Sequence, residues 1–160
     1  MRWFRTVKAA SVVVIAFLLT SCASGPPVAE PREAAPFVGC YKLTLGPWVP
    51  KVDLEGDEDF VAMSEAIRLT DEIGSQGFQR GHFLLRSVAG TAQGRIPPSY
   101  WRLEGKNDLV LVWTDGYSSI KAELTRVRDG LRGRAETHWD FPREAQTRNV
   151  TATPMPCPTR

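Results

Sequence analysis

Histidines and catalytic motifs are scarce in this sequence. Its 160 residues include only two histidines, His82 and His138, and no Gly-x-Ser-x-Gly or Cys-x-x-Cys motif. Nucleophilic catalysis needs an oriented base beside the nucleophile, and a zinc site needs three or four convergent ligands. Two histidines on distant segments favour neither kind of site. We therefore expect that the protein is not an enzyme and holds no metal or other cofactor.

An excess of one charge is also absent. The formal net charge is +2, and three of the 20 basic side chains, Arg2, Arg5 and Lys8, lie in an N-terminal segment with the features of a leader. Without that segment, 17 basic side chains face 18 acidic ones. Nucleic-acid binding needs clustered basic side chains that acidic neighbours do not offset. The composition therefore predicts no nucleic-acid partner.

Two charged segments leave alternatives open. The chain from Asp53 to Asp59 carries five carboxylates and is either a solvated acidic loop or a Ca²⁺ site. Four arginines between Arg126 and Arg134 surround an Asp-Gly pair, and they form either a solubilising hairpin end or a basic rim for lipid phosphates. We favour the solvated interpretation of both segments.

No hydrophobic run is long enough to cross a membrane as a helix. The longest, from Ala9 to Leu19, has 11 residues, whereas a spanning helix needs about 20. It follows the basic N-terminus and precedes Leu19-Thr20-Ser21-Cys22, which is the arrangement of a secretory signal peptide. The four residues resemble the lipobox of bacterial lipoproteins.

The lipobox resemblance implies that residues 1–21 are a signal peptide and that Cys22 becomes the lipidated N-terminus. Its thiol would carry diacylglycerol and its amino group a third acyl chain. Ala23 stands where the family's inner-membrane retention signal has Asp, so the resemblance implies an outer-membrane anchor facing the periplasm or the cell surface. Two or three acyl chains would make the membrane attachment durable.

The segment after Cys22 is rich in proline. Residues 23–36 contain four prolines in fourteen residues and no apolar periodicity. Such segments stay extended and act as spacers. We expect residues 22–36 to form a tether and residues 37–160 to form a single folded domain.

Three cysteines bear on the fold. If lipidation uses Cys22, Cys40 and Cys157 remain as an even pair in an oxidising compartment. The first lies at the start of the predicted domain and the second close to the end of the chain. We predict a structural disulfide between them.

Alternation of apolar and polar residues dominates from Phe37 onward, and no stretch of ten residues has helical periodicity. Asp115-Gly116 and Asp129-Gly130 separate alternating runs, which predicts two-residue hairpins with positive φ at both turn positions. The pattern predicts an all-β domain, an antiparallel up-and-down barrel of about eight strands. The expected strands are 37–45, 65–73, 79–88, 99–103, 109–114, 118–127, 131–140 and 148–155.

The first predicted strand contains Gly39-Cys40-Tyr41. This resembles the Gly-x-Trp motif that opens lipocalins, with Tyr in place of Trp. The resemblance implies a calycin-like cup that holds a small apolar molecule.

Apolar faces of five predicted strands would converge inside such a barrel. We expect a small apolar or amphipathic ligand to contact five residues: Tyr41, Leu69, Trp101, Trp113 and Trp139. Small residues on the last of these faces, Gly133 and Ala135, would leave it space. The alternative is a filled barrel that acts as a scaffold, interaction protein or inhibitor through its loops. The interior distinguishes the two.

Overall fold

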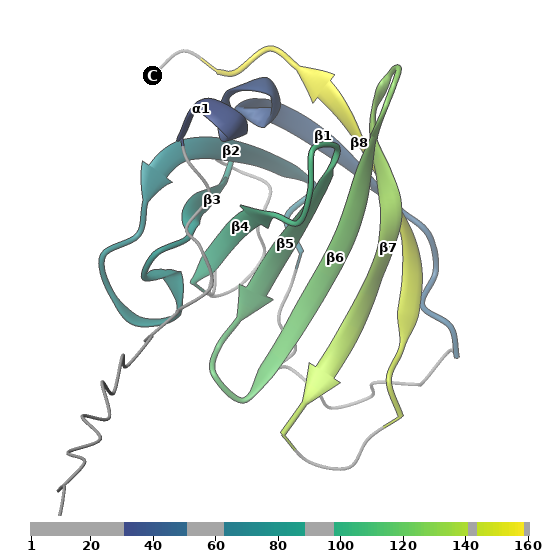
Figure 1. The fold of residues 1–160 in the computed structure, drawn as a ribbon. Coiled ribbons are helices and arrows are strands. Elements are labelled where there is room, and N and C mark those ends of the chain that lie inside the picture. The colour runs from purple at the N-terminus through teal and green to yellow at the C-terminus, as the bar shows by residue number, and fades with distance from the viewer. Residues whose placement is uncertain (1–30, 51–62, 89–97, 141–143, 159–160) are drawn as a thin grey trace, which may run out of the picture.

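Eight antiparallel strands close into an up-and-down barrel, in which each strand pairs with its neighbours in the sequence and β8 pairs with β1 (Figure 1). The computed structural model describes residues 31–50, 63–88, 98–140 and 144–158. The predicted fold class is confirmed. The strands are β1 Gly39–Leu45, β2 Ala66–Ile73, β3 Phe83–Ser87, β4 Ser99–Leu103, β5 Asp108–Thr114, β6 Ser118–Val127, β7 Gly130–Trp139 and β8 Thr147–Met155.

The hairpins β5–β6 and β6–β7 occur where the Asp-Gly pairs predicted them, but their turns differ from the expected type. No residue other than glycine has positive φ among the described residues, so neither aspartate adopts that conformation. Arg128 and Asp129 form the β6–β7 turn, and Gly130 follows it with a φ of 144° as the first residue of β7.

Residues before the first strand belong to the folded domain. Pro31–Ala34 form the helical turn α1 and Ala35–Phe37 the short 3₁₀ helix η1, and both lie over one end of the barrel (Figure 1). Ala34 and Phe37 are fully buried members of the core. The folded domain therefore begins earlier than the predicted boundary at Phe37, because even a proline-rich segment can bury its few apolar side chains.

The strand β5 is buried on both faces. Leu109, Leu111 and Trp113 point into the barrel, while Val110 and Val112 on the outer face are also buried. Val110 lies between Arg102 and Glu123 in the sheet, and Val112 lies between Tyr100 and Lys121. Long side chains of this kind cover apolar neighbours with their stems while their polar ends reach water. The expected cover from residues 60–66 falls largely outside the described residues.

The predicted disulfide is present between Cys40 and Cys157, whose Cα atoms are 5.2 Å apart. Cys40 lies on β1 opposite Met155, so the bond attaches the tail that follows β8 to the first strand. It closes a loop of 117 residues. Within the described residues, no helix has the length and apolar character needed to cross a bilayer.

Candidate functional site

The two ends of the barrel differ in structure. One end, which we call the capped end, carries α1, η1 and the β6–β7 turn (Figure 1). The other, the loop end, carries the β5–β6 turn and the segments that leave β1 and enter β8, residues 46–50 and 144–146. The inward-facing residues of each end decide where a ligand has room.

The capped end is filled by aromatic side chains whose polar atoms bond within the protein. The Tyr41 hydroxyl donates to the Phe37 carbonyl at 2.9 Å, and the Trp101 indole donates to the Thr70 carbonyl at 2.9 Å. The rings of Phe83 and Trp101 lie 4.8 Å apart. Burial raises the pKa of the Tyr41 hydroxyl, although the nearby Arg126 guanidinium opposes the shift. This half of the barrel is a packed core.

The structure places the five predicted ligand residues in two environments. Tyr41, Leu69, Trp101 and Trp113 are buried together in the hydrophobic core. Trp139 is partly exposed at the end of β7, opposite Ser118, and therefore lies at the loop end. Only Trp139 among the five reaches solvent where a ligand could approach, and the role of all five in binding stays a prediction.

Residues 46–50 extend the sheet at the loop end beyond the last residue of β1. Val49 and Thr147 exchange two backbone hydrogen bonds, each 2.8 Å long, and the Gly46 amide donates to the Asn149 carbonyl at 2.9 Å. This pairing holds Trp48 against the apolar core as a partly buried side chain. The segment thus forms a wall of the barrel beside the start of β8.

Arg148 lies on this part of β8, two residues before the buried Val150. Alternation along a strand places the two side chains on the same, inward face. The Arg148 Nε atom donates to the Gly46 carbonyl at 2.8 Å, and the guanidinium carbon lies 4.5 Å from the centre of the Trp48 ring. Burial lowers the pKa of Arg148. No carboxylate of the described residues forms an ion pair with it.

Gln146 is the next residue on the same face, and it is only 2% exposed. Its backbone amide donates to the Thr137 hydroxyl at 2.9 Å, and its side-chain amide donates to the Pro50 carbonyl at 3.2 Å. The Oε1 atom is buried without a hydrogen-bond partner among the described residues. A buried acceptor of this kind is costly unless water or a ligand supplies a donor.

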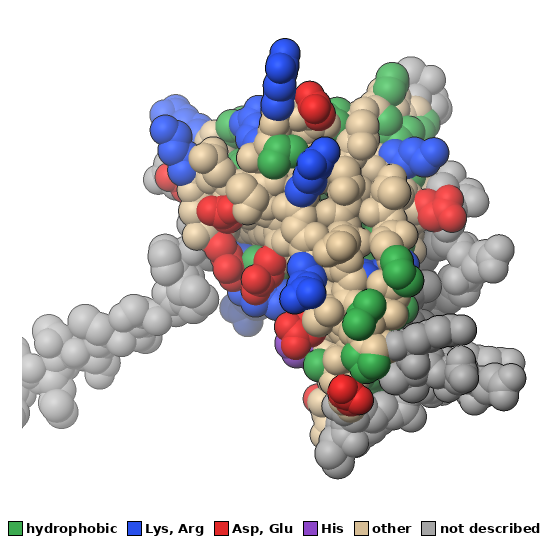
Figure 2. All heavy atoms as spheres, turned by 90° about the vertical axis from the view of Figure 1, so that its right-hand side faces the viewer, with side chains coloured by type: hydrophobic (Ala, Val, Ile, Leu, Met, Phe, Trp, Pro, Cys, Tyr) green, Lys and Arg blue, Asp and Glu red, His purple; other side chains and the backbone are tan. Residues whose placement is uncertain are grey.

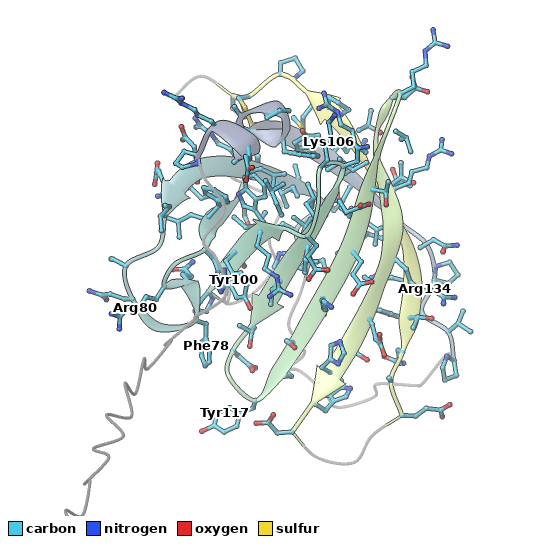
Figure 3. All side chains as sticks on the ribbon, viewed as in Figure 1. Phe78, Arg80, Tyr100, Lys106, Tyr117 and Arg134 are labelled. Carbon is cyan, nitrogen blue, oxygen red and sulfur yellow. A yellow bond between two sulfur atoms is a disulfide. The ribbon has the colours of Figure 1, made fainter. Side chains whose placement is uncertain are left out.

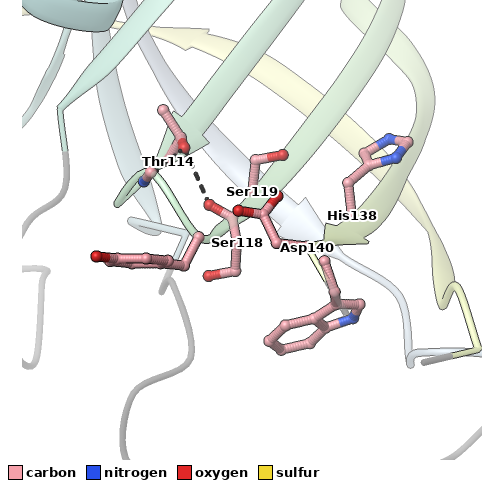
Figure 4. A pocket seen from close by; sticks show the side chains of 8 residues that line it. Thr114, Ser118, Ser119, His138 and Asp140 are labelled. Atoms are coloured by element: carbon pink, nitrogen blue, oxygen red, sulfur yellow. Dashed lines mark hydrogen bonds between the residues drawn. The ribbon is translucent and has the colours of Figure 1, made fainter. Parts of the chain in front are cut away.

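A small hollow adjoins Trp139 at the loop end, where β5 and β7 end and β6 begins (Figure 4). Its volume is about 90 Å³, and Thr114, Ser118, Ser119 and His138 contribute polar atoms to its wall. The Thr114 hydroxyl donates to the Ser118 carbonyl at 3.0 Å. A space of this size holds about three water molecules, so it is too small for a hydrocarbon chain.

A larger hollow of about 380 Å³ lies on the outer face of β5, β6 and β7. Its acidic residues have partners: the Thr125 hydroxyl donates to Asp108 at 2.6 Å, Glu123 pairs with Lys121 at 2.5 Å, and Glu104 pairs with Arg102 at 2.6 Å. Arg134 lies opposite Glu123 in the sheet. The hollow is therefore part of the polar outer surface, where acidic and basic side chains lie side by side.

The four arginines around the β6–β7 turn do not form one cluster. Arg126 lies at the capped end over the Phe37 ring, 5.5 Å from its centre, whereas Arg132 and Arg134 lie on the outer face of β7. Basic and acidic side chains are interspersed on the face of the molecule in Figure 2. The solvated interpretation fits this division better than a phosphate-binding rim.

The two histidines lie apart and have different surroundings. His82 stacks on Tyr100 with ring centres 4.5 Å apart, and burial, together with the charge of Arg102, lowers its pKa. His138 lies on β7, beside the small hollow. The described residues contain no group of three or more potential metal ligands. The acidic segment from Asp53 to Asp59 is outside the described residues.

The sequence analysis missed Arg148 and Gln146 as candidate site residues. A signal for Arg148 existed, because it shares the alternation of Val150 and Ala152 and is the charged residue on an otherwise apolar face. Gln146 precedes the strand and gave no such signal. Its burial depends on the segment 46–50 lying beside it, which alternation within one strand does not reveal.

No family model matches the chain, and neither the curated proteins nor the solved structures contain a match. The resemblances to bacterial lipoproteins and to lipocalins therefore stay predictions.

Proposed function

We propose that the mature protein is a lipid-anchored component of a bacterial cell envelope that binds a small amphipathic molecule at the loop end of its barrel. The observation that carries the binding proposal is a group of partly exposed apolar side chains between the core and the loop end. Leu45, Trp48 and Met63 pack on the core but stay partly exposed, and Trp139 is partly exposed at the same end. Apolar walls with a few polar groups are typical of small-molecule sites.

The proposed site is shallow. The barrel interior next to it is filled by four buried residues, Tyr41, Leu69, Trp101 and Trp113. An eight-stranded barrel has an interior just wide enough for side chains or one small ligand. A ligand that extended to these four residues would have to displace the core. We therefore assign contact with the ligand to Trp48 and Trp139 rather than to the buried aromatic residues.

The anchor in this proposal is Cys22, by the resemblance of Leu19-Thr20-Ser21-Cys22 to a lipobox. An acylated N-terminus would hold the barrel near a bilayer, where amphipathic molecules concentrate. The proposal includes no catalytic step, in line with the scarcity of histidines and the lack of a nucleophile motif in the sequence. It includes no nucleic-acid partner, because basic and acidic side chains balance along the chain.

A second candidate function is a protein interaction through the outside of the barrel. Phe78 is 56% exposed and Tyr117 is 75% exposed, and both lie on the lower left of the barrel in Figure 3. The Phe78 ring packs against the β5–β6 turn, because a Cβ atom at Gly116 would lie 3.2 Å from it. Exposed aromatic residues of this kind are enriched in interfaces, which favours a scaffold or inhibitor as the alternative.

The proposed function is tested on the mature protein isolated from membranes. Its intact mass should correspond to a chain that begins at an acylated Cys22. The same preparation, in a fluorinated surfactant whose chains mix poorly with hydrocarbon, is titrated with decanol while tryptophan fluorescence is recorded. We expect a saturable change. An unmodified N-terminus elsewhere contradicts the anchor, and the absence of saturation contradicts the binding proposal and favours the scaffold.

A further inference from the structure

We propose that the loop end selects amphipathic molecules with an oxyanion head group, a carboxylate or a phosphate, which Arg148 binds inside the barrel with Gln146 beside it. This inference rests on the proposed function and names the ligand class for the same site. Its basis is the arrangement of the Arg148 cation against the Trp48 ring, with Gln146 Oε1, an acceptor that lacks a partner among the described residues, on the next inward position.

The guanidinium of Arg148 is partly removed from water, and no carboxylate among residues 31–50, 63–88, 98–140 and 144–158 pairs with it. Its Nε atom donates to the Gly46 carbonyl, and its guanidinium carbon lies over the Trp48 ring. No hydrogen bond or ion pair within the described residues engages its two terminal nitrogens. A partly buried cation that lacks an opposite charge is unfavourable. Burial also lowers the pKa of Arg148. An anion that entered the barrel would relieve this cost.

Two other arginines of the sheet are already paired with carboxylates. Arg102, which is also partly buried, pairs with Glu104 at 2.6 Å. Arg86 is more exposed and still pairs with Glu72 at 2.5 Å. Arg148 differs from both in facing the interior and in having terminal nitrogens that no described residue engages. Two parallel N–H groups match the geometry of a carboxylate or phosphate, which can accept both hydrogen bonds at once.

The side-chain positions of Arg148 and Gln146 are about 7 Å apart along β8, since residues two apart in a strand share a face. The buried Oε1 atom of Gln146 is an acceptor. It would therefore receive a hydrogen bond from a hydroxyl or N–H group carried next to the oxyanion, or from a water that the ligand retains. The Trp48 ring, which Arg148 covers, and Trp139 would contact the hydrocarbon.

The test compares three probes of equal chain length: decanoate, decyl phosphate and decanol. Each is titrated into the mature full-length protein, into Arg148→Gln and into Arg134→Gln. The last variant is a matched control, since Arg134 is an exposed arginine on the outer face of the neighbouring strand. We expect Arg148→Gln to weaken binding of decanoate or decyl phosphate by about 10- to 100-fold and to leave decanol binding within about 3-fold. Arg134→Gln should bind all three probes like the wild type.

Several outcomes distinguish this inference from the proposed function. Wild-type protein that binds decanol as tightly as both anions, with no effect of Arg148→Gln, overturns the inference and leaves the binding site in place. No saturable binding of any probe overturns the proposed function itself. Preference for decanoate over decyl phosphate identifies a carboxylate ligand, and the reverse identifies a phosphate.

A structural role for Arg148 would give a different pattern. In that case Arg148→Gln would lower the thermal midpoint and weaken all three probes equally, which would contradict the inference. Arg148→Lys retains the charge but loses the paired N–H geometry. We expect it to keep a preference for the anions over decanol, and the loss of that preference in a folded Arg148→Lys protein would also contradict the inference.

Discussion

At the scale of single residues, Gly133 shows how closely β6 and β7 approach each other. It pairs with Leu124, and a Cβ atom built on it would overlap the carbonyl oxygen of Glu123. The expectation that Gly133 leaves space for a ligand is therefore wrong, because the backbone of β6 occupies that space. Glycine at such a position permits the close contact and the bend that help to close a barrel.

Substitution of Gly133 should accordingly destabilise the protein. We expect Gly133→Ala to lower the free energy of unfolding by about 2 kcal/mol or more, because backbone rather than a movable side chain blocks the new methyl group. Denaturant unfolding measures the change. The control is Gly105→Ala, where the nearest atom to a new Cβ is 3.4 Å away. Equal stability of Gly133→Ala and the wild type would show that the two strands are not in contact as described.

Residues at the loop end show what a single sequence conceals. The inward direction of Arg148 follows from its position two residues before Val150 on the same strand, and the sequence alone provides that spacing. The contact with Trp48 does not follow, because it depends on residues 46–50 running beside β8 after β1 has ended. Alternation describes one strand at a time, so contacts between a strand and an irregular segment lie beyond it.

At the scale of elements, strong alternation and turn signals predicted most strands well. The strands Ser99–Leu103 and Ser118–Val127 have their predicted bounds. The strand β3 is shorter than predicted, because residue 79 ends a 3₁₀ helix and residues 80–82 connect this helix to the strand. The helix α1 was missed because a segment with four prolines lacks any periodic pattern, although one turn suffices to bury Ala34.

The disulfide joins two elements at the ends of the domain, β1 and the tail after β8. Removing it should destabilise the fold, because the bond restricts the unfolded chain over a loop of 117 residues. We expect Cys157→Ser to lower the free energy of unfolding by about 2–5 kcal/mol.

The measurement is denaturant unfolding with and without a reductant. Reductant should lower the stability of the wild type to near that of Cys157→Ser and leave the variant unchanged. Peptide mapping without reduction should recover Cys40 linked to Cys157. Two free thiols in protein from an oxidising compartment would contradict the bond.

At the scale of the whole molecule, the barrel has a sealed half and an accessible half. Phe37 and Tyr41 close the capped end over a core of large aromatic and aliphatic residues. The loop end instead exposes part of its apolar wall. It also carries the Arg148 cation, which no described carboxylate pairs with, and the Gln146 Oε1 acceptor, which has no hydrogen-bond partner in the described part of the chain. The packed core at the capped end stabilises the fold, and the arginine at the loop end is the basis of the proposed selectivity.

The most direct test of this division locates a bound molecule among the tryptophans. Bromine quenches tryptophan fluorescence on contact, so decanol with bromine on its last carbon is titrated into the mature protein. The variants are Trp48→Phe/Trp139→Phe, which lacks the two partly exposed indoles, and Trp101→Phe, which lacks a fully buried one. We predict saturable quenching in the wild type and in Trp101→Phe and its loss in the double variant. Quenching that persists in the double variant and disappears in Trp101→Phe would place the ligand in the capped half and contradict the account.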